Sequence, residues 1–265
     1  MPKYGYLVVE GPHDVEFIYR LLRPFGLVRV QFHDRLDEYF KPLVPNKFPF
    51  KGDLQRRVPV PLFLQSSSHA VAIHSAVGDT RLLETIEENS AVIDYTQLTG
   101  IGILLDTDNQ VSAHERYATI KRGLERKGYI LPDLPANVSQ GRPRLGGFVL
   151  PDNENAGNLE DLLIECAQRV YPELLGSARQ HVELASNVPS LAGDGEDLSK
   201  TQIRNKAVVG SIASVLRPGK AIQTSIQDNK WVRGESLQLE RIKAVQNFLA
   251  DLLELPISQL RRRGQ

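Results

Sequence analysis

The sequence of 265 residues is poor in cysteine and carries no excess charge. Cys166 is the single cysteine, which excludes an intrachain disulfide and a zinc site built from cysteines. Lysine plus arginine and aspartate plus glutamate both total 32. This balance argues against a protein that coats nucleic acid through bulk positive charge. A hydrophobic content of 41% is typical of a soluble globular protein of one large domain or two small ones.

Long apolar runs are also missing. No stretch approaches the roughly 18–20 apolar residues that a membrane span needs. The apolar run at 4–9 is too short for a signal peptide and meets a carboxylate at Glu10. We therefore expect a protein that lies in the cytoplasm and has no contact with a membrane.

The pattern over residues 1–170 predicts an α/β domain. Apolar segments typical of strands alternate with segments whose apolar residues share one helical face. The expected strands are 4–9, 69–74, 101–105 and 146–150, and the expected helices are 12–23, 79–89, 112–127 and 158–170. Strand and helix in strict alternation favour a parallel, Rossmann-like sheet with helices on its faces.

Residues 27–67 interrupt this alternation. Five prolines fall between positions 42 and 61, and each removes a backbone donor that a central strand needs. We interpret 27–67 as a Pro-rich insertion whose 42–61 portion contributes no central strand. It would form a cover over one sheet edge or, alternatively, a flap or partner-binding surface.

Residues 171–265 are expected to form a helical extension or subdomain. Apolar residues recur at helical spacing over about 174–185, 203–215 and 237–252. A stretch rich in Ser, Gly, Asp and Pro separates the first two of these segments, which is typical of a loop.

Three of the expected strands run into an acidic residue. These residues are Glu10, Asp106 and Asp152, and the carboxyl ends of parallel strands meet at one edge of a sheet. Gathering carboxylates there costs repulsion that a divalent cation would offset. Oxygen ligands alone select magnesium or manganese before zinc.

Further acidic residues lie beside these three. Asp108 follows Asp106 by two positions, Asp14 begins the first helix, and Glu160 lies in the first turn of a later one. Acidic residues also favour helix N-termini through the macrodipole, which is an alternative explanation for Asp14. Glu160 or Asp14 would complete a second metal site.

These residues resemble a known fold family. Glu10-Gly11-Pro12-His13-Asp14 and Asp106-Thr107-Asp108, each after a strand, resemble the Toprim pattern of topoisomerases, primases and related nucleases. Leu150-Pro151-Asp152-Asn153 and the run 157–161 resemble stand-alone Toprim-like proteins related to the nuclease domain of overcoming-lysogenisation-defect nucleases. The resemblance implies a general acid or base at Glu10, magnesium held by Asp106 and Asp108, and hydrolysis of phosphodiesters.

Several basic residues are candidates to bind phosphate groups beside the predicted metal site. Arg142 and Arg144 lie on a Gly/Pro-punctuated loop, and Lys121 lies on an expected helix, where a solvated face is the simpler explanation. His13 lies inside the acidic motif, and we expect it to be an ordinary histidine rather than a ligand. The sequence has no phosphate-binding loop of an ATPase, so such an activity would have to come from a partner protein.

Two functions are compatible with this pattern. The first is a magnesium-dependent (or manganese-dependent) nuclease of the Toprim class that acts on DNA or RNA, as a homo-oligomer or with a partner. The second is a non-catalytic Toprim-like module that binds nucleotides or proteins. Convergence of Glu10, Asp106, Asp108 and Asp152 on one ion would favour the enzyme.

Overall fold

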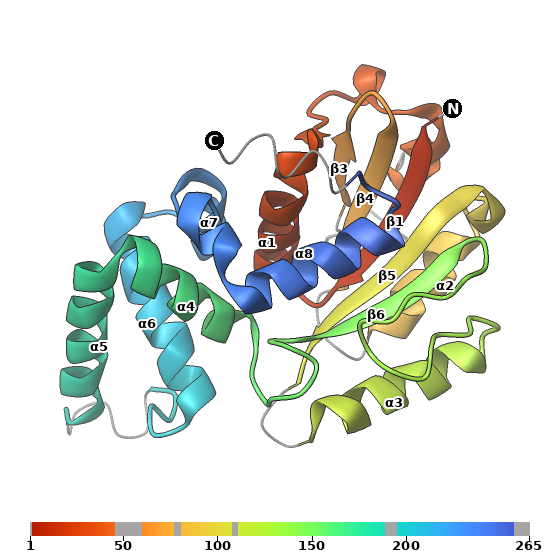
Figure 1. Ribbon diagram of the computed structural model, residues 1–265. Coiled ribbons are helices and arrows are strands. Elements are labelled where there is room, and N and C mark those ends of the chain that lie inside the picture. Colours follow the sequence, from red (N-terminus) through yellow and green to blue (C-terminus); the bar gives the residue numbers. More distant parts are fainter. Residues whose placement is uncertain (1, 46–59, 77–80, 108–110, 189–194, 257–265) are drawn as a thin grey trace.

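The computed structural model describes residues 2–45, 60–76, 81–107, 111–188 and 195–256. Its centre is a six-stranded sheet in the order β2-β3-β4-β1-β5-β6 (Figure 1). The strands are β1 (Lys3–Val9), β2 (Val28–Arg29), β3 (Leu62–Gln65), β4 (His69–Ser75), β5 (Leu98–Asp106) and β6 (Arg144–Leu150). The chain is thus an α/β protein with a mostly parallel sheet.

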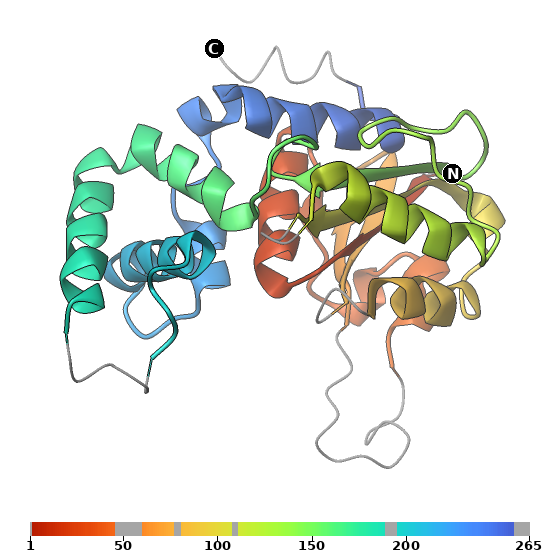
Figure 2. The same ribbon diagram turned by 90° about the horizontal axis from the view of Figure 1, so that it is seen from below.

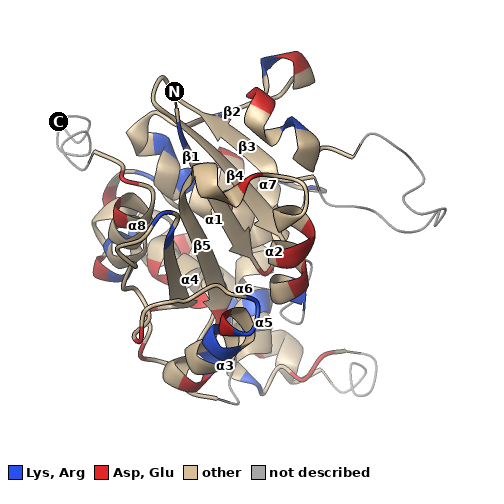
Figure 3. Ribbon diagram, turned by 90° about the vertical axis from the view of Figure 1, so that its right-hand side faces the viewer, with Lys and Arg blue, Asp and Glu red and all other residues tan. Residues whose placement is uncertain are grey.

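The four parallel strands, β4, β1, β5 and β6, confirm the predicted alternation. β1 pairs in parallel with β4 on one side and β5 on the other, and β5 pairs in parallel with β6. Their apolar runs are buried on both faces, as expected for strands that helices cover twice. Along these strands the ribbon carries few charged residues, which gather on the helices and at strand ends (Figure 3).

Helices cover both faces of the sheet. α1 (Pro12–Leu22) and α8 (Glu240–Leu252) pack on one face, and α2 (Leu82–Ser90) and α3 (Ala113–Glu125) pack on the other (Figures 1 and 2). Alternate residues of β1 divide between the two cores, since Leu7 packs with α1 and α8 while Tyr6 packs with α2 and α3. The period of two along a strand makes this division.

The interpretation of 27–67 needs a correction. This segment supplies β2 and β3, which extend the sheet in the antiparallel sense, with Leu62 opposite Ile73 of β4. β3 covers the edge that β4 would otherwise expose, so the edge-cover interpretation holds for this part. The described residues of 42–61, namely 42–45 and 60–61, contain no strand, and 46–59 lie outside the described residues.

Residues 171–265, predicted as a helical extension or subdomain, divide between two places in the fold. α4 (Leu159–Val170), α5 (Pro172–Ser186), α6 (Thr201–Leu216) and the unpredicted α7 (Ile222–Asp228) form a helical group beside the sheet (Figure 1). α8, by contrast, returns to the sheet and shares its core. Residues 171–265 therefore do not form a unit of their own. Among the helices of the described residues, none combines the length and the apolar character needed to span a bilayer.

Glycines let α8 approach the sheet closely. A Cβ atom at Gly100 would lie 2.3 Å from the carbonyl oxygen of Leu252, and one at Gly102 would lie 2.5 Å from a Leu252 methyl group. Gly146 meets Phe248 in the same way, at 2.8 Å. The C-terminal helix therefore depends on three residues without side chains in β5 and β6.

We predict that Gly100→Ala destabilises the fold by about 1–3 kcal/mol, because the new methyl group meets backbone that cannot move aside. Denaturant unfolding followed by circular dichroism measures the change. Gly176→Ala is the matched control, since a Cβ atom at this position of α5 meets nothing within 4 Å. We expect the control to be unchanged or up to about 1 kcal/mol more stable. Equal stability of the two variants would contradict the close packing of α8.

Candidate acidic site at the carboxyl ends of the strands

Glu10 and Asp106 lie at a topological switch point of the sheet. Glu10 directly follows β1, and Asp106 is the last residue of β5. The two strands are adjacent and parallel. The next helix after β1 is α1 and the next after β5 is α3, and these two helices pack on opposite faces. The chain therefore diverges at this point, where open α/β sheets bind their ligands.

The two carboxylates are tied together by protein donors. The backbone N–H of Asp106 donates to Glu10 Oε1 at 3.1 Å, and Arg116 Nη2 lies 3.0 Å from the same oxygen. Arg116 Nε also donates to the carbonyl oxygen of Asp106 at 3.3 Å. The Asp106 carboxylate accepts the backbone N–H of Leu159, the first residue of α4, at 3.1 Å. Three elements of the fold thus hold this pair in place.

Asp14 and Glu160 join this group as buried acids. Asp14 Oδ2 accepts the backbone N–H of Gly11 at 2.8 Å and so caps α1. Burial, then the charge of Glu10 and more weakly that of Glu160, raise the pKa of Asp14 to about 7. Burial also raises the pKa of Glu160, against the opposing charge of Lys206. Glu10 therefore contacts Asp106, and the charges of Glu10 and Glu160 act on Asp14, which also caps α1.

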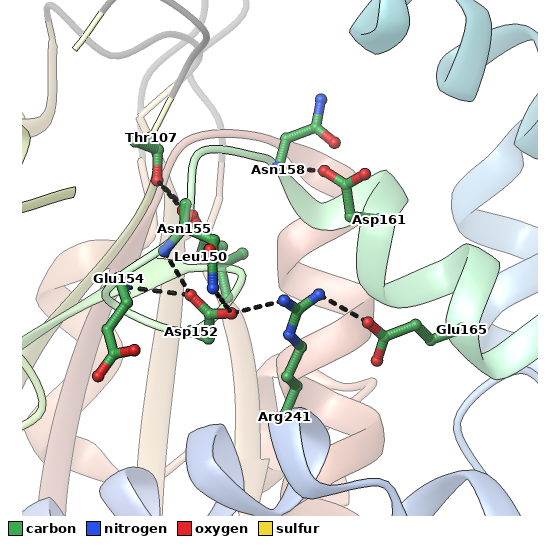
Figure 4. Close-up of polar contacts among 9 residues, drawn as sticks. All are labelled: Thr107, Leu150, Asp152, Glu154, Asn155, Asn158, Asp161, Glu165 and Arg241. Carbon is green, nitrogen blue, oxygen red and sulfur yellow. Dashed lines mark hydrogen bonds and ion pairs between the residues drawn. The ribbon is translucent and has the colours of Figure 1, made fainter. Parts of the chain in front are cut away.

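Asp152 does not join them, contrary to the expectation for the third strand end. It accepts hydrogen bonds from the backbone of Glu154 and Asn155 and from the Asn155 side chain, at 2.8–3.1 Å (Figure 4). Arg241 of α8 pairs with it at 2.8 Å and with Glu165 at 2.7 Å. Burial alone would raise the pKa of Asp152, but these bonds and the Arg241 charge lower it. A proline directly after β6 begins a turn that aims this carboxylate at α8 instead.

Thr107 is a structural residue that the sequence analysis missed. Its side chain is fully buried and donates to the carbonyl oxygens of Leu150 at 2.7 Å and Asn155 at 3.3 Å. Its backbone N–H donates to Gly157 at 3.1 Å. These bonds hold the turn after β6 against the end of β5. In the sequence, the sign of this structural role is a small hydroxyl residue placed between two aspartates.

Asn158 places an unsatisfied acceptor in the same turn. Its side chain is 1% exposed, and its Oδ1 atom has no hydrogen-bond partner among the described residues. The next residue, Leu159, is the one that donates to Asp106. A buried oxygen without a donor is costly unless a cation or another donor reaches it.

The helical group beside the sheet also reaches the acidic residues. Asn205 of α6 donates to Asp161 of α4 at 2.8 Å. The charge of its neighbour, Lys206, acts on Glu160 and on His13. Burial first, and then Lys206, lower the pKa of His13 against a hydrogen bond with Gln223. His13 thus faces the helical group.

The predicted phosphate-binding residues lie elsewhere. Arg144 begins β6 and pairs with Asp251 at 2.8 Å, about 20 Å along the strand from Leu150. Arg142, two residues before it, lies 3.7 Å from Glu254. Lys121 pairs with Asp133 at 2.7 Å, as a solvated helix face would predict. The cations near the acidic residues are instead Arg116 and Lys206.

Part of the predicted site cannot be placed. Asp108 lies outside the described residues. Within the ranges that the structure describes, no three side chains of His, Cys, Asp or Glu are grouped so that they could hold a metal ion. Glu10 accepts hydrogen bonds from the Asp106 N–H group and from Arg116, and the Asp106 carboxylate accepts one from the Leu159 N–H group.

The comparisons with known proteins place this architecture in a family. A model described as "Protein of unknown function (DUF3226)" matches residues 4–254. The chain belongs to this family. A solved structure, a hypothetical protein from Pyrococcus horikoshii OT3, is similar with 18% identity and a TM-score of 0.49 over 98% of each chain. No curated protein matches the chain.

We predict that Thr107→Val destabilises the protein by about 1–3 kcal/mol, because it removes the donor to two buried carbonyl groups. Thr119→Val is the control, since the side-chain hydrogen bonds of this exposed threonine are with Glu115 and Arg122 of its own helix. The control should stay within about 0.5 kcal/mol of wild type. Thermal unfolding of both variants decides whether the turn after β6 depends on Thr107.

We predict that stability depends on pH through Asp14. An acid whose pKa is raised by folding contributes stability below its ordinary value of 3.8, and that stability is lost as the pH rises through about 7. Asp14→Asn should therefore gain stability relative to wild type between about pH 5 and about pH 8, by an amount on the order of 1–4 kcal/mol. Urea unfolding with chelator present measures it.

Asp94→Asn serves as the control for this pH series. Hydrogen bonds from Thr96 and Gln97 lower the pKa of this exposed carboxyl group. Asp94→Asn should therefore be less stable than wild type once the pH is high enough to ionise this carboxyl group. If the stability of wild type and that of Asp14→Asn changed with pH in parallel, folding would not raise the pKa of Asp14.

Proposed function

We propose that this protein is a Toprim-like, magnesium-dependent phosphoryl-transfer enzyme that hydrolyses phosphodiester bonds in nucleic acid. The observation that carries the proposal is the gathering of Glu10, Asp14, Asp106 and Glu160 at one switch point. A fold that brings these acids together needs positive charge at that place. Asn158, whose Oδ1 atom is buried without a hydrogen-bond partner among the described residues, directly precedes Leu159, the residue that donates to Asp106.

By the chemistry of their side chains, though not as a group of three in one place, the described acidic residues suit a hard divalent cation. Their donors are carboxylate and amide oxygens, which suit magnesium or manganese better than zinc. Glu10, Asp14, Asp106 and Glu160 would hold it, with Asp108 as the predicted additional ligand; Asp152 is left out because it pairs with Arg241. A bound ion would supply positive charge to phosphate oxygens and activate water for attack.

The remaining chemistry falls to side chains of this chain. A bound cation would favour the ionised form of Asp14, whose pKa is about 7 without an ion. Glu10 is the general acid or base that the family resemblance favours. Arg116 and Lys206 bring positive charge to the acidic residues and are suited to a phosphate group of the substrate.

We place this activity in the cytoplasm, because the single cysteine is buried and free and thiols stay reduced in that compartment. The ATPase that larger Toprim nucleases carry would come from a partner protein, and a homo-oligomer is the other arrangement that we propose. The substrate is DNA or RNA, and the assay below compares the two.

A non-catalytic module is the second candidate. The ion pair between Arg116 and Glu10 favours it, because it neutralises a predicted ligand within the protein itself. Such a protein would bind a nucleotide, a nucleic acid or another protein without cleaving it.

We predict that Asp106→Asn lowers magnesium-dependent or manganese-dependent cleavage by at least about 100-fold, because the ion loses a charged ligand. Asparagine keeps the oxygen that accepts the Leu159 N–H group, so the fold should persist. Single-stranded and double-stranded DNA and RNA, each with magnesium, manganese or chelator, form the substrate panel. Binding without cleavage of any substrate by wild type would favour the module.

Asp152→Asn is the matched control for this assay. It removes the partner of Arg241 and should cost up to about 1 kcal/mol of stability. Activity should stay within a few-fold of wild type. Loss of cleavage in Asp152→Asn with full cleavage in Asp106→Asn would contradict the proposed division between the two residues.

A further inference from the structure

Arg20 carries a buried positive charge that the described residues leave largely without acceptors. It lies in α1 and is 3% exposed. Its Nη2 atom donates to the carbonyl oxygen of Val232 at 3.4 Å, which is a long hydrogen bond. Its Nε and Nη1 atoms are buried and have no hydrogen-bond partner among the described residues. A buried charge of this kind is costly unless an opposite charge reaches it.

Two more arginines belong with Arg20 to a closed ring of contacts. Arg233, next in the chain to the acceptor of Arg20, donates from Nη2 to the carbonyl oxygen of Gln227 at 3.1 Å. Arg29 of β2 donates to the Gln227 side chain at 3.1 Å and to the Glu16 carboxylate. Glu16 lies one helical turn before Arg20 on α1, which closes the ring. The Nε atoms of Arg29 and Arg233 are also buried, and neither has a partner in the part of the chain that the structure describes.

The charges of this ring do not balance. Its three arginines are joined to one carboxylate within the described chain, that of Glu16, which Arg29 already engages. Asp228 is another acid whose charge acts on Glu16, but it pairs with Arg217 at 3.3 Å. Three arginines less one glutamate leave an excess of two positive charges, which a dianion would neutralise.

Capping of α7 explains only part of the ring. Positive side chains near a helix C-terminus stabilise the last carbonyl groups, and Arg233 does so at Gln227. Arg20 has no such role, because its acceptor, Val232, lies beyond the end of α7. A buried water molecule would accept the N–H groups but would leave the charge of Arg20 uncompensated.

We propose that the ring around Arg20, Arg29 and Arg233 is a binding site for a small oxyanion with the size and charge of phosphate. Guanidinium groups bind phosphate oxygens through paired N–H donors. The Arg29 side chain is 23% exposed and Arg20 is 3% exposed, so the anion would enter beside Arg29 and reach Arg20 inside. Arg20 lies six residues, or about 9 Å along α1, from Asp14. The site needs no metal ion and does not rest on the proposed function.

The test is a titration of the full chain with inorganic phosphate by isothermal calorimetry, in metal-free Tris chloride buffer. Arg20→Met removes the charge and keeps a long side chain that suits a helix. It should bind phosphate at least about tenfold more weakly than wild type, because charge-assisted hydrogen bonds are lost.

Thermal melts of the same two proteins give a second readout. Without phosphate, Arg20→Met should melt at the temperature of wild type or higher, because an uncompensated buried charge has been replaced by an apolar group. Phosphate should raise the melting temperature of wild type by more than that of Arg20→Met. A purely structural role of Arg20 predicts the opposite, a lower melting temperature for the variant and no effect of phosphate on either protein.

Further variants separate charge, shape and position. Arg20→Lys keeps the charge without the planar fork, and its affinity for phosphate should lie between those of wild type and Arg20→Met. Arg23→Gln is the matched control, since it removes an exposed positive charge at the end of the same helix and should leave the affinity unchanged. If Arg20→Met does not fold by circular dichroism, Arg233→Gln takes its place with the same expected loss of affinity.

A nucleoside monophosphate forms a second arm of the titration, because a free ion and a terminal phosphate group present the same oxygen atoms. Binding of inorganic phosphate alone would assign the site to the free ion, and binding of both would assign it to the phosphate group of a larger molecule. Absence of phosphate binding by wild type would overturn the proposal, and so would equal affinity of wild type and Arg20→Met. Neither result bears on the nuclease assay, since no metal takes part in this one.

Discussion

The repulsion between acidic side chains at the carboxyl ends of β1 and β5 is the constraint on which the rest of the structure depends. Parallel strands bring their ends to one edge, so Glu10 and Asp106 meet whatever their charge. The fold offsets the cost with backbone N–H groups, a helix N-terminus and Arg116. Burial first, and then the charge of Glu10, raise the pKa of Asp14 to about 7.

Distant parts of the chain are organised around this edge. Thr107 fixes the turn after β6, and Arg241 of α8 fixes the same turn from the other side through Asp152. α8 can do so because the glycines of β5 and β6 let it lie directly on the sheet. α6 contributes Asn205 and the charge of Lys206. The C-terminal third is therefore part of the acidic site as well as of the core.

Local patterns predicted the elements better than their assembly. The four parallel strands and the helices that follow them agree with apolar periodicity and capping residues, as at Ser112. The short strand β3 was missed because four residues after a proline carry little pattern. Arg142 and Arg144 were linked to the acidic residues because they lie on a loop, but their loop is at the other end of β6. Residues before a strand lie at its amino end, opposite the carboxyl ends where the acidic residues are, so the order of the sequence already argued against this link.

The sequence by itself determined the class of fold and the acidic character of the strand ends, because both depend on residues close together in the chain. Only the tertiary structure decided which acids share one place. It joined Asp14 and Glu160 to Glu10, and it turned Asp152 toward Arg241, 89 positions later in the chain. It also paired Arg116 with Glu10 across 106 positions. Such pairs depend on which helices cover which face of the sheet, and that choice is made by packing of the whole chain rather than by any local pattern.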